Sequence, residues 1–593
     1  MNVLGVDVGG TFTDAVLLSD GELRTAKVPT ARRQEESVLA AARAVGVAGY
    51  DVERFTHGTT VATNALLERK GARTAFVATA GFEHLLHLRR QNRAQLYRLC
   101  AAHAEPLVPL ERCVGVRERI GPEGVIAPLE LRSLPELGAE VEAVAVCLLF
   151  AFRDSSHEEA VAEELRRRLP GRRIVASHQV APEFREYERA STTAIDAYLG
   201  PVAARYLEAL RAACADAGLP EPLVMGSSGG VVSLVEAAAH PALALVSGPA
   251  AGVVGAARIA RLSGVENAIS LDMGGTSTDV CLIMGGAARR AAEREVAGLP
   301  VRLPTVDLQT VGAGGGSIVW RDSGGALRVG PESAGAEPGP ACYGRGGSRP
   351  TLTDANLLLG RLPERIAGGL ELDRPAAERA FTGIEPEEAI AVVNSEMLRA
   401  LRLVSVERGH DPRDFALVAF GGAGPLHACA LADELGVETV LVPEAAGVLS
   451  ALGLAVGDER RDRISSYVSP LEDAGELPAE GEADLRYAGQ SFELTVPLEE
   501  DLAAAFHRAH EARYGYADPA RPVELVAVRT AEVRSGPELQ LPAAAPVEAR
   551  GPMRIELDGA TCWLPPGWEG VRDGTDSTLR VTKVSRDRGN SGT

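Results

Sequence analysis

Two segments of the chain share one pattern of apolar and polar positions, and they predict the same local structure. Residues 3–18 and residues 268–283 each hold an apolar run, an Asp, a Gly-Gly pair followed by two Thr, a second Asp and another apolar run. This pattern predicts a strand, a tight turn and a returning strand. The second copy keeps the shared residues in the same order and spacing. A repeat separated by so much sequence predicts a duplicated unit.

The rest of the chain alternates between helical and strand patterns. The spacing of apolar residues predicts helices over 35–45, 156–169, 190–217 and 385–407. Short apolar runs predict strands over 74–78, 143–150, 174–176, 415–420 and 439–442. Gly and Pro dominate 324–350, which predicts either a functional loop assembly or a spacer. This alternation predicts an α/β fold.

The length of 593 residues predicts several domains. We expect a first α/β half over 1–180 and a second half with Gly-rich inserts over 181–475. A smaller α+β region is expected over 476–593, ending in a polar tail over 584–593.

The chemistry of each hairpin suits a phosphate group. Gly at the turn lets backbone N–H groups approach a ligand without a Cβ in the way, and Thr hydroxyls add donors. Asp7 and Asp272 end the first strand of each copy, where a carboxylate suits a hydrated Mg²⁺ ion. The alternative is an ordinary hairpin whose Asp and Thr satisfy turn amides. Two copies facing each other would form a clamp for a polyphosphate.

A polar loop follows the predicted strand around residues 54–56. It reads His57-Gly58-Thr59-Thr60 and leads into a predicted helix that stops at Gly71. Ligands of open α/β sheets bind at the carboxyl ends of strands, where His57, Thr59 and Thr60 would lie. The alternative is that one of the two threonines only caps the helix.

A third Gly-rich turn separates the strand predicted over 415–420 from a helix over 428–435. It reads Gly421-Gly422-Ala423-Gly424 and places bare backbone at the carboxyl end of a sheet. Such a surface suits a flat base or a ribose.

Composition excludes several classes of protein. The net charge of −20 argues against a nucleic-acid partner, because phosphate backbones need a basic face. No uncharged apolar run is long enough to span a bilayer, and the first residues carry no signal-like segment. The eight Cys are scattered without CxxC spacing, which disfavours a zinc or iron–sulfur site. We therefore expect a cytoplasmic protein with reduced thiols and no membrane partner.

The ordered motifs of the chain resemble a known family. The two hairpins and the third Gly turn resemble the phosphate-1, phosphate-2 and adenosine motifs of the actin/Hsp70/sugar-kinase ATPase fold. Segments that resemble the hydantoinase A / 5-oxoprolinase family lie at 57–68, 312–317, 339–347, 353–356, 420–427 and 486–493. The resemblance runs from residue 3 to about residue 535. It implies duplicated actin-like (ribonuclease H-like) ATPase domains with a cleft between them.

The resemblance also implies an activity. Members of this family use ATP to open cyclic amides of the hydantoin, 5-oxoproline or lactam type by phosphorylating the amide oxygen, often with a separate B-type subunit. Relatives include ATP-using subunits of acetone and acetophenone carboxylases, so a ketone carboxylase subunit is an alternative. A nucleotide-binding scaffold without turnover is a second alternative. The implied cofactors are ATP and Mg²⁺ or another divalent ion, and the implied assembly is an oligomer.

The resemblance assigns roles to individual residues. Asp7 and Asp272 would position Mg²⁺ and act in catalysis, with His57, Thr59, Thr60 and Asn64 on the substrate side. The nucleotide ligands would be Gly9, Gly10, Thr11 and Thr13 on one side, Gly274, Gly275, Thr276 and Ser277 on the other, and Gly421, Gly422 and Gly424 at the nucleoside. Two features depart from the family pattern: Gln309 stands where many relatives carry His, and the region around 537–552 is shorter.

Overall fold

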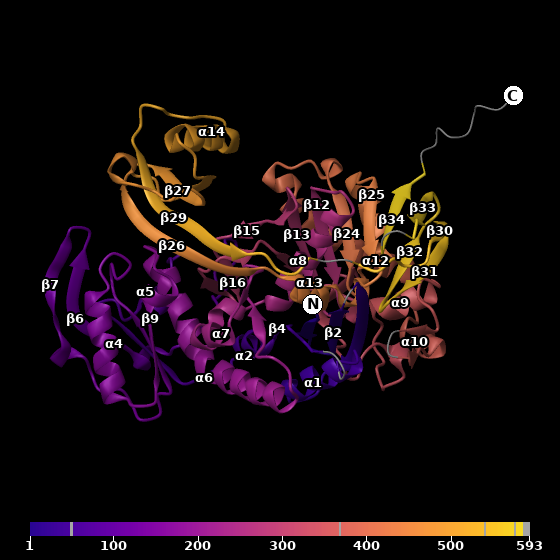
Figure 1. Cartoon of the computed structure of the whole chain (residues 1–593), viewed down its shortest axis with the longest axis horizontal. Coiled ribbons are helices and arrows are strands. Elements are labelled where there is room, and N and C mark those ends of the chain that lie inside the picture. The colour runs from indigo at the N-terminus through magenta and orange to yellow at the C-terminus, as the bar shows by residue number, and fades with distance from the viewer. Residues whose placement is uncertain (20, 48–50, 367–368, 539–540, 575–576, 585–593) are drawn as a thin grey trace.

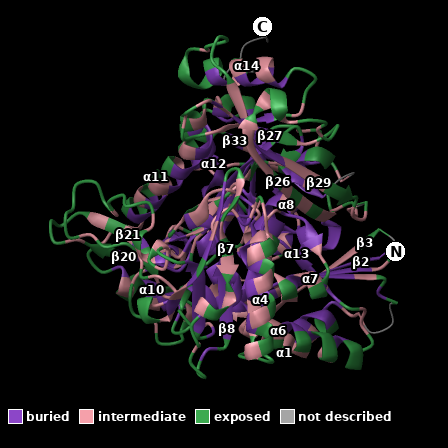
Figure 2. Cartoon of the chain, turned by 90° about the vertical axis from the view of Figure 1, so that its left-hand side faces the viewer, coloured by how far each residue is buried: buried purple, intermediate pink, exposed green. Residues whose placement is uncertain are grey.

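The computed structural model describes residues 1–19, 21–47, 51–366, 369–538, 541–574 and 577–584. Two large mixed sheets lie at its centre, and a smaller sheet lies at the left of the view in Figure 1. The strands of the two central sheets are largely buried, while the outer faces of the surrounding helices are exposed (Figure 2). The polar tail expected at 584–593 lies outside the described residues beyond residue 584.

The two central sheets repeat one topology. In the first sheet the strands are β1 (Val3–Val8), β2 (Phe12–Ser19), β3 (Glu22–Pro29), β4 (Arg54–Gly58) and β10 (Leu223–Met225); in the second they are β12 (Ala268–Met273), β13 (Thr278–Met284), β14 (Ala287–Ala288), β24 (Ala416–Phe420) and β25 (Thr439–Pro443). Numbered along the chain, the five strands of each set lie side by side in the order third, second, first, fourth, fifth. The first three pair in antiparallel fashion with their neighbours. The fourth is parallel to the first, and the fifth is parallel to the fourth. The register is also the same, because Asp7 pairs with Asp14 and Asp272 pairs with Asp279. The predicted duplication is confirmed.

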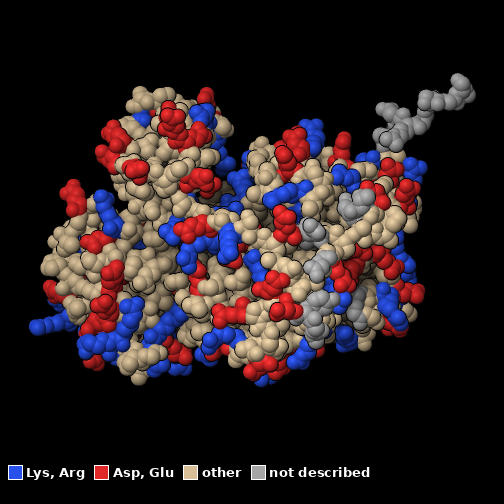
Figure 3. Space-filling view, in the orientation of Figure 1, with Lys and Arg blue, Asp and Glu red and all other residues tan. Residues whose placement is uncertain are grey.

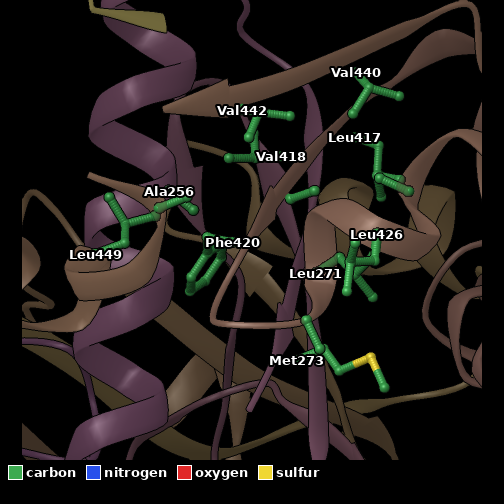
Figure 4. Close-up of a cluster of buried hydrophobic side chains, with 14 of the residues drawn as sticks. Ala256, Leu271, Met273, Leu417, Val418, Phe420, Leu426, Val440, Val442 and Leu449 are labelled. Atoms are coloured by element: carbon green, nitrogen blue, oxygen red, sulfur yellow. The ribbon is translucent and has the colours of Figure 1, made fainter. Parts of the chain in front are cut away.

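Two helices join the halves through close backbone contacts. Helix α8 (Ser247–Leu262) and helix α13 (Leu449–Val456) cross where a Cβ added to Gly453 would lie 1.9 Å from the carbonyl oxygen of Ala251. Strand β1 approaches α13 as closely, because a Cβ on Gly5 would lie 2.1 Å from the carbonyl oxygen of Ala451. These positions therefore require Gly. Figure 4 shows the adjoining apolar core, with Leu449 beside Ala256 of α8.

An inserted unit interrupts the first half. Strands β5 (Thr74–Thr79), β6 (Cys113–Gly121), β7 (Gly124–Glu130), β8 (Ala143–Cys147) and β9 (Arg173–Ala176) form a separate sheet with helix α4 (Ser156–Arg168). The elements predicted over 74–78, 143–150, 156–169 and 174–176 are present, but they belong to this sheet and not to the first central one. The first sheet gains its next strands only at β10 and β11 (Val231–Val232), so it does not end at the boundary expected at residue 180.

The C-terminal region divides between the two central sheets. The first sheet is extended by β26 (Glu459–Pro470), β27 (Glu482–Tyr487), β28 (Leu494–Pro497) and β29 (Val523–Arg534). Helix α14 (Leu502–Tyr514) packs on these strands. The second sheet is extended by β30 (Val547–Arg550), β33 (Trp568–Arg572) and β34 (Thr578–Lys583). The hairpin of β31 (Met553–Leu557) and β32 (Ala560–Leu564) packs against α12 (Gly424–Leu435). The segment expected as one unit over 476–593 therefore contributes to both halves, since apolar periodicity does not reveal which sheet a strand joins.

The remaining elements surround these sheets. The helices are α1 (Gln34–Ala44), α2 (Val61–Leu67), α3 (Leu85–Leu88), α5 (Ser177–Val180), α6 (Glu186–Asp216), α7 (Leu234–Ala239), α9 (Leu352–Leu358), α10 (Arg374–Ala380) and α11 (Pro386–Val404). The short strands are β15 (Arg290–Ala291), β16 (Arg294–Val296), β17 (Leu299–Val301), β18 (Thr305–Val306), β19 (Gln309–Val311), β20 (Ser317–Arg321), β21 (Leu327–Ser333), β22 (Arg365–Ile366) and β23 (Leu370–Glu371). Part of the Gly/Pro-rich segment over 324–350 thus forms a hairpin, in which β21 pairs with β20.

A buried ion network fixes the C-terminal strands to the segment before α6. Glu183 accepts hydrogen bonds from Arg302 at 2.5 Å and from Arg529 of β29 at 3.0 Å. Arg529 also pairs with Asp484 of β27 at 2.9 Å. The Glu183 side chain is 1% exposed. Burial opposes the charge of Arg302, but the carboxylates of Glu183 and Glu293 outweigh it and raise the Arg302 pKa.

We expect Glu183→Gln to destabilise the chain strongly, because the substitution leaves two buried guanidinium groups without their shared carboxylate. The expected loss is about 3–5 kcal/mol, measured by calorimetry and denaturant unfolding. Arg463→Gln is the matched control, since the Arg463–Glu532 pair is 60% and 65% exposed and such pairs contribute about 0–1 kcal/mol. Equal effects of the two substitutions would contradict the role of the network.

Candidate functional site

The two repeated turns meet along one face of helix α8. A Cβ added to Gly248 would lie 3.4 Å from Oδ1 of Asp7, and a Cβ added to Gly252 would lie 3.2 Å from Oδ2 of Asp272. Positions four residues apart lie on the same face of a helix, one turn from each other. The structure therefore brings Asp7 and Asp272 together, although 265 positions separate them in the sequence (272 − 7).

Each turn leaves backbone donors available. The N–H of Gly9 donates to the carbonyl of Phe12 at 3.0 Å, and the N–H of Gly274 donates to the carbonyl of Ser277 at 3.1 Å. These bonds close the two turns in the same way. The next two residues of each turn have backbone N–H groups without an acceptor in the described part of the chain. They are Gly10 and Thr11 in the first turn and Gly275 and Thr276 in the second. Unpaired amides on a tight turn form a cradle for an anion.

Three glycines of the predicted site face open space. A Cβ added to Gly10, Gly275 or Gly422 would meet no heavy atom within 4 Å, and none of the three has a positive φ. The fold therefore does not require Gly at these positions. Gly421 differs, because its φ is +76° and a Cβ there would lie 2.4 Å from Oδ1 of Asp272. The space beside the other three residues can admit a ligand close to the backbone.

The threonines of the turns have two different environments. Thr13 is fully buried, and its hydroxyl lies 3.0 Å from the hydroxyl of Thr30. Its counterpart Thr278 is also buried and donates to the carbonyl of Ala313 at 2.5 Å. Both side chains lie behind the turn because neighbouring strand residues point to opposite faces. Thr11 is only partly buried, so it is the residue of the first turn whose hydroxyl can reach a ligand.

The paired carboxylates need a cation. Burial raises the pKa of Asp7 to about 7, with the Asp14 carboxylate adding to the shift, and Oδ1 of Asp7 is buried without a hydrogen-bond partner. Burial raises the pKa of Asp272 to about 8, and the carboxylates of Asp279 and Asp7 add to it. Asp14 and Asp279, the strand partners of these two residues, each have a contact of their own. Asp14 pairs with Lys27 at 2.5 Å, and Asp279 accepts a hydrogen bond from the Thr310 hydroxyl at 2.5 Å.

These residues fit a hydrated divalent ion. No group of three or more His, Cys, Asp or Glu side chains in the described residues could enclose a metal. Mg²⁺ commonly uses one or two carboxylates and fills its other positions with water and substrate phosphate. An unpartnered buried carboxylate oxygen next to free turn amides matches this arrangement.

His57 and Thr59 are engaged by the scaffold. His57 is fully buried; its Nδ1 lies 3.1 Å from the carbonyl of Val6 and its Nε2 lies 2.7 Å from the hydroxyl of Tyr206 on α6. Burial lowers the pKa of His57 to about 4. The Thr59 carbonyl accepts from the hydroxyl of Ser247 at the start of α8, at 2.9 Å. Both residues therefore position β4, α6 and α8 around the site.

Thr60 and Asn64 lie on the more open part of the same motif. Thr60 precedes helix α2 but its side chain makes no capping hydrogen bond, whereas the Thr59 hydroxyl accepts from the N–H of Val61 at 3.2 Å. Asn64 lies on the first turn of α2 and is partly buried. The cap-only alternative therefore describes Thr59 better than Thr60.

A Gly-rich loop over 312–316, beside the second turn, belongs to the site, although the predicted ligand set does not include it. The N–H groups of Gly315 and Gly316 donate to the carbonyls of Gly274 and Gly275 at 2.9 and 2.7 Å. A Cβ on Gly314 would lie 2.5 Å from the amide nitrogen of Thr276. The run of glycines over 312–316 is the sequence signal for this close backbone packing.

The motif at 353–356 has a structural role. Thr351 and Asp354 form a capping box at the start of α9. Asp354 also accepts from the N–H of Cys342 at 2.7 Å and so holds the loop over 339–342. Asn356 lies 3.4 Å from Nε2 of His427, whose Nδ1 lies 2.8 Å from Asn394. These contacts join α9, α11 and α12 behind the third turn.

Charged side chains of both signs cover the visible surface. Figure 3 shows Lys and Arg interspersed with Asp and Glu over the face in view, without a continuous basic surface. Among the described helices, none has the length and apolarity needed to cross a bilayer.

Comparison with known proteins identifies the family. The family model described as hydantoinase/oxoprolinase N-terminal region matches residues 3–169, and the model described as hydantoinase/oxoprolinase matches residues 189–463. The chain belongs to the hydantoinase/oxoprolinase family. This assignment confirms the family expected from the motifs.

Several curated members of the hydantoinase/oxoprolinase family are similar over most of the chain. Caprolactamase subunit alpha of Pseudomonas jessenii is 34% identical, over 88% of this chain and 85% of the relative. Acetophenone carboxylase gamma subunit of Aromatoleum aromaticum is 36% identical, over 77% and 68%. 5-oxoprolinase 1 of Arabidopsis thaliana is 34% identical, over 78% of this chain but only 42% of that much longer relative.

Solved structures of two members have the same fold. The crystal structure of ATP-dependent caprolactamase from Pseudomonas jessenii has a TM-score of 0.85 and 31% identity, and the match covers 98% of this chain and 99% of that one. Nucleotide-free acetone carboxylase has a TM-score of 0.76, 24% identity and coverage of 98% and 100%. Together with the repeated topology, these matches confirm the predicted class of duplicated actin-like ATPase domains.

We expect Gly275→Ala to leave the fold intact and to weaken ATP binding. The new methyl group enters open space in the free chain, so the change in stability should stay within about 0.5 kcal/mol. A phosphate held by the turn amides would meet that methyl group, and ATP affinity measured by titration calorimetry should fall by about tenfold or more. Gly314→Ala is the matched control and should lower the melting temperature, because its Cβ meets backbone at 2.5 Å. Unchanged ATP affinity in Gly275→Ala would exclude the turn as a ligand site.

We expect the stability of the nucleotide-free, metal-free chain to fall as pH rises from about 4 to about 8. In this window the unfolded chain has already released the Asp7 and Asp272 protons, which the folded chain still holds because the folded pKa values are raised to about 7 and about 8. Asp272→Asn should flatten the profile of melting temperature against pH. The exposed Asp473→Asn should not. Parallel profiles for the wild-type chain, Asp272→Asn and Asp473→Asn would refute the raised pKa of Asp272.

Proposed function

We propose that this chain is the ATP-using subunit of an enzyme that hydrolyses a cyclic amide. The observation that carries the proposal is the convergence of two duplicated turns, each with two free amides, on a pair of unneutralised carboxylates. Phosphoryl transfer depends mainly on positioning and on neutralising charge, which this arrangement supplies. The similarity to ATP-dependent caprolactamase over almost the whole chain supports a lactam-type substrate.

The proposed roles follow the geometry. The amides of Gly10, Thr11, Gly275 and Thr276 hold phosphate oxygens of ATP, and Gly422 faces the nucleoside. The backbone of the three turns is formed with the help of residues that do not contact the nucleotide themselves: Gly9 and Thr13 in the first, Gly274 and Ser277 in the second, and Gly421 and Gly424 in the third. Asp7 and Asp272 hold Mg²⁺ with its waters, and this ion neutralises charge on the phosphates. Thr60 and Asn64 face the substrate, whereas His57 and Thr59 position β4, α6 and α8.

The proposed reaction balances without a further reagent. The amide oxygen attacks the γ-phosphorus of ATP, the bond from that phosphorus to the bridging oxygen breaks, and ADP leaves. The product is an O-phosphorylated imidate, in which phosphate is a good leaving group. Addition of two water molecules then breaks the ring C–N bond and releases phosphate, a carboxylate and an amine on one linear molecule. An unactivated amide would have to expel a much poorer leaving group.

We also propose that the chain works with a second, B-type subunit in a cytoplasmic oligomer. Two relatives are named as subunits, of caprolactamase and of acetophenone carboxylase. The single-chain 5-oxoprolinase 1 carries more than half of its length outside the match. A partner supplying the hydrolytic half is consistent with both facts.

A ketone carboxylase subunit is the second candidate. The identity to acetophenone carboxylase gamma subunit, 36%, is as high as that to caprolactamase subunit alpha. In that reaction the same turns would activate an enolate oxygen. The two candidates differ in their second substrate, which is water in one case and bicarbonate in the other.

Substrate-dependent release of ADP tests the proposal. The chain, co-expressed with a B-type hydantoinase subunit, should release ADP and a ring-opened product, which is an amino acid from a lactam or 5-oxoproline and an N-carbamoyl amino acid from a hydantoin. Asp7→Asn and Asp272→Asn should each lower kcat by about a hundredfold or more, which corresponds to about 2.7 kcal/mol of transition-state stabilisation. The exposed Asp473→Asn should retain full activity.

Three results would count against the proposal. Ketone consumption that requires bicarbonate would identify the carboxylase instead. ATP binding without turnover on any substrate would identify a scaffold. Full activity in both Asp variants would remove the metal site.

A further inference from the structure

A cavity of about 410 Å³ lies beside the second turn and outside the contacts described so far. Its walls are strand β19, the hairpin of β20 and β21, and one face of helix α11. Val392, Glu396, Arg399 and Leu403 line it from α11, at the spacing of a single helix face. A volume of this size suits a small molecule.

The cavity carries two opposite charges that the protein does not neutralise. Glu396 is half-buried and Arg399 is exposed at the rim, and neither has an ion-pair or hydrogen-bond partner among the described residues. The other cation at the wall, Arg328, is held by Asp322 at 3.0 Å. The free carboxylate and the free guanidinium are one helical turn apart. A ligand with one ammonium and one carboxylate group would satisfy both.

The rest of the lining is apolar. Val311, Ala313, Val329 and Pro331 contribute aliphatic surface, and the indole ring of Trp320 stands at the wall with its Nε1 donating to the Gly330 carbonyl at 2.8 Å. An aliphatic chain between the two charged groups would pack against this surface. Gln309, the residue that departs from the family pattern, also lines the cavity.

The cavity shares a strand with the nucleotide site. Thr310 of β19 lines the cavity and donates to Oδ1 of Asp279, the strand partner of Asp272, at 2.5 Å. The chain then continues through Gly312 into Gly315 and Gly316, whose amides hold the carbonyls of the second turn. A ligand in the cavity therefore contacts the segment that supports the turn.

We propose that this cavity binds a short linear aliphatic amino acid and that its occupancy is coupled to nucleotide binding. Opening of a cyclic amide releases a molecule of this class, so the identity of the ligand rests on the proposed function. The site itself rests on the charges and shape of the cavity. Because coupling of two binding sites is reciprocal, the amino acid and the nucleotide change each other's affinity by the same factor.

Titration calorimetry on the full-length chain tests the site. The probes are linear ω-amino acids from 4-aminobutyrate to 6-aminohexanoate, with hexanoate and hexylamine as analogues that each lack one charge. At least one amino acid should bind about tenfold more tightly than either analogue, as expected for one lost charge-assisted hydrogen bond. Arg399→Gln and Glu396→Gln should each weaken binding by about tenfold. Arg402→Gln, on the same helix but outside the cavity lining, should not.

The outcomes separate this inference from the proposed function. Absence of binding, equal binding of the analogues, or an equal effect of Arg402→Gln would overturn the site. Binding that leaves the affinity for a non-hydrolysable ATP analogue unchanged would overturn the coupling. Binding needs no turnover, so a chain that binds the amino acid but releases no ADP with any cyclic amide would retain the site and lose the proposed function.

Discussion

The contact of two carboxylates with the bare backbone of one helix is the constraint on which the site depends. Gly248 and Gly252 allow α8 to approach Asp7 and Asp272 without an intervening side chain. A Cβ at Gly252 would lie 2.9 Å from the Phe420 ring and 3.2 Å from Oδ2 of Asp272, so a neighbour would have to shift, whereas a Cβ at Gly248 would make ordinary contact with Asp7. The approach buries both carboxylates, which raises their pKa values and creates the demand for a cation. The close approach of α8 therefore determines both the packing around Asp7 and Asp272 and their raised pKa values.

Duplication makes the two turns similar, but the residues that surround each turn differ. Asp14 and Asp279 occupy equivalent positions in register, but a Lys27 ammonium neutralises the first and the Thr310 hydroxyl only bonds to the second. The second turn is also supported by a Gly-rich loop, through the N–H groups of Gly315 and Gly316. The two similar turns thus differ in the charges and in the backbone contacts that surround them.

The sequence predicts the local structure well and the long-range arrangement only in part. The spacing of Asp7 and Asp272 from their Gly pairs is enough to predict both hairpins, because turn chemistry is local. It does not reveal that the strands over 74–176 form a sheet of their own, since strand periodicity is the same in every sheet. His57 has the polarity of a ligand residue in the sequence, yet Tyr206 from distant α6 engages it. The role of the glycines over 314–316 depends likewise on a neighbour distant in sequence.

The last strand of the described chain protects an edge of the repeated part of the second sheet. Strand β34 (Thr578–Lys583) pairs along the whole of β25 (Thr439–Pro443), the outermost of the five repeated strands in the second sheet. Without β34, strand β25 would present an unpaired, apolar edge to the solvent. Exposed edges of this kind recruit other chains. Detachment of β34 would therefore expose β25 to aggregation without altering either of the two repeated turns.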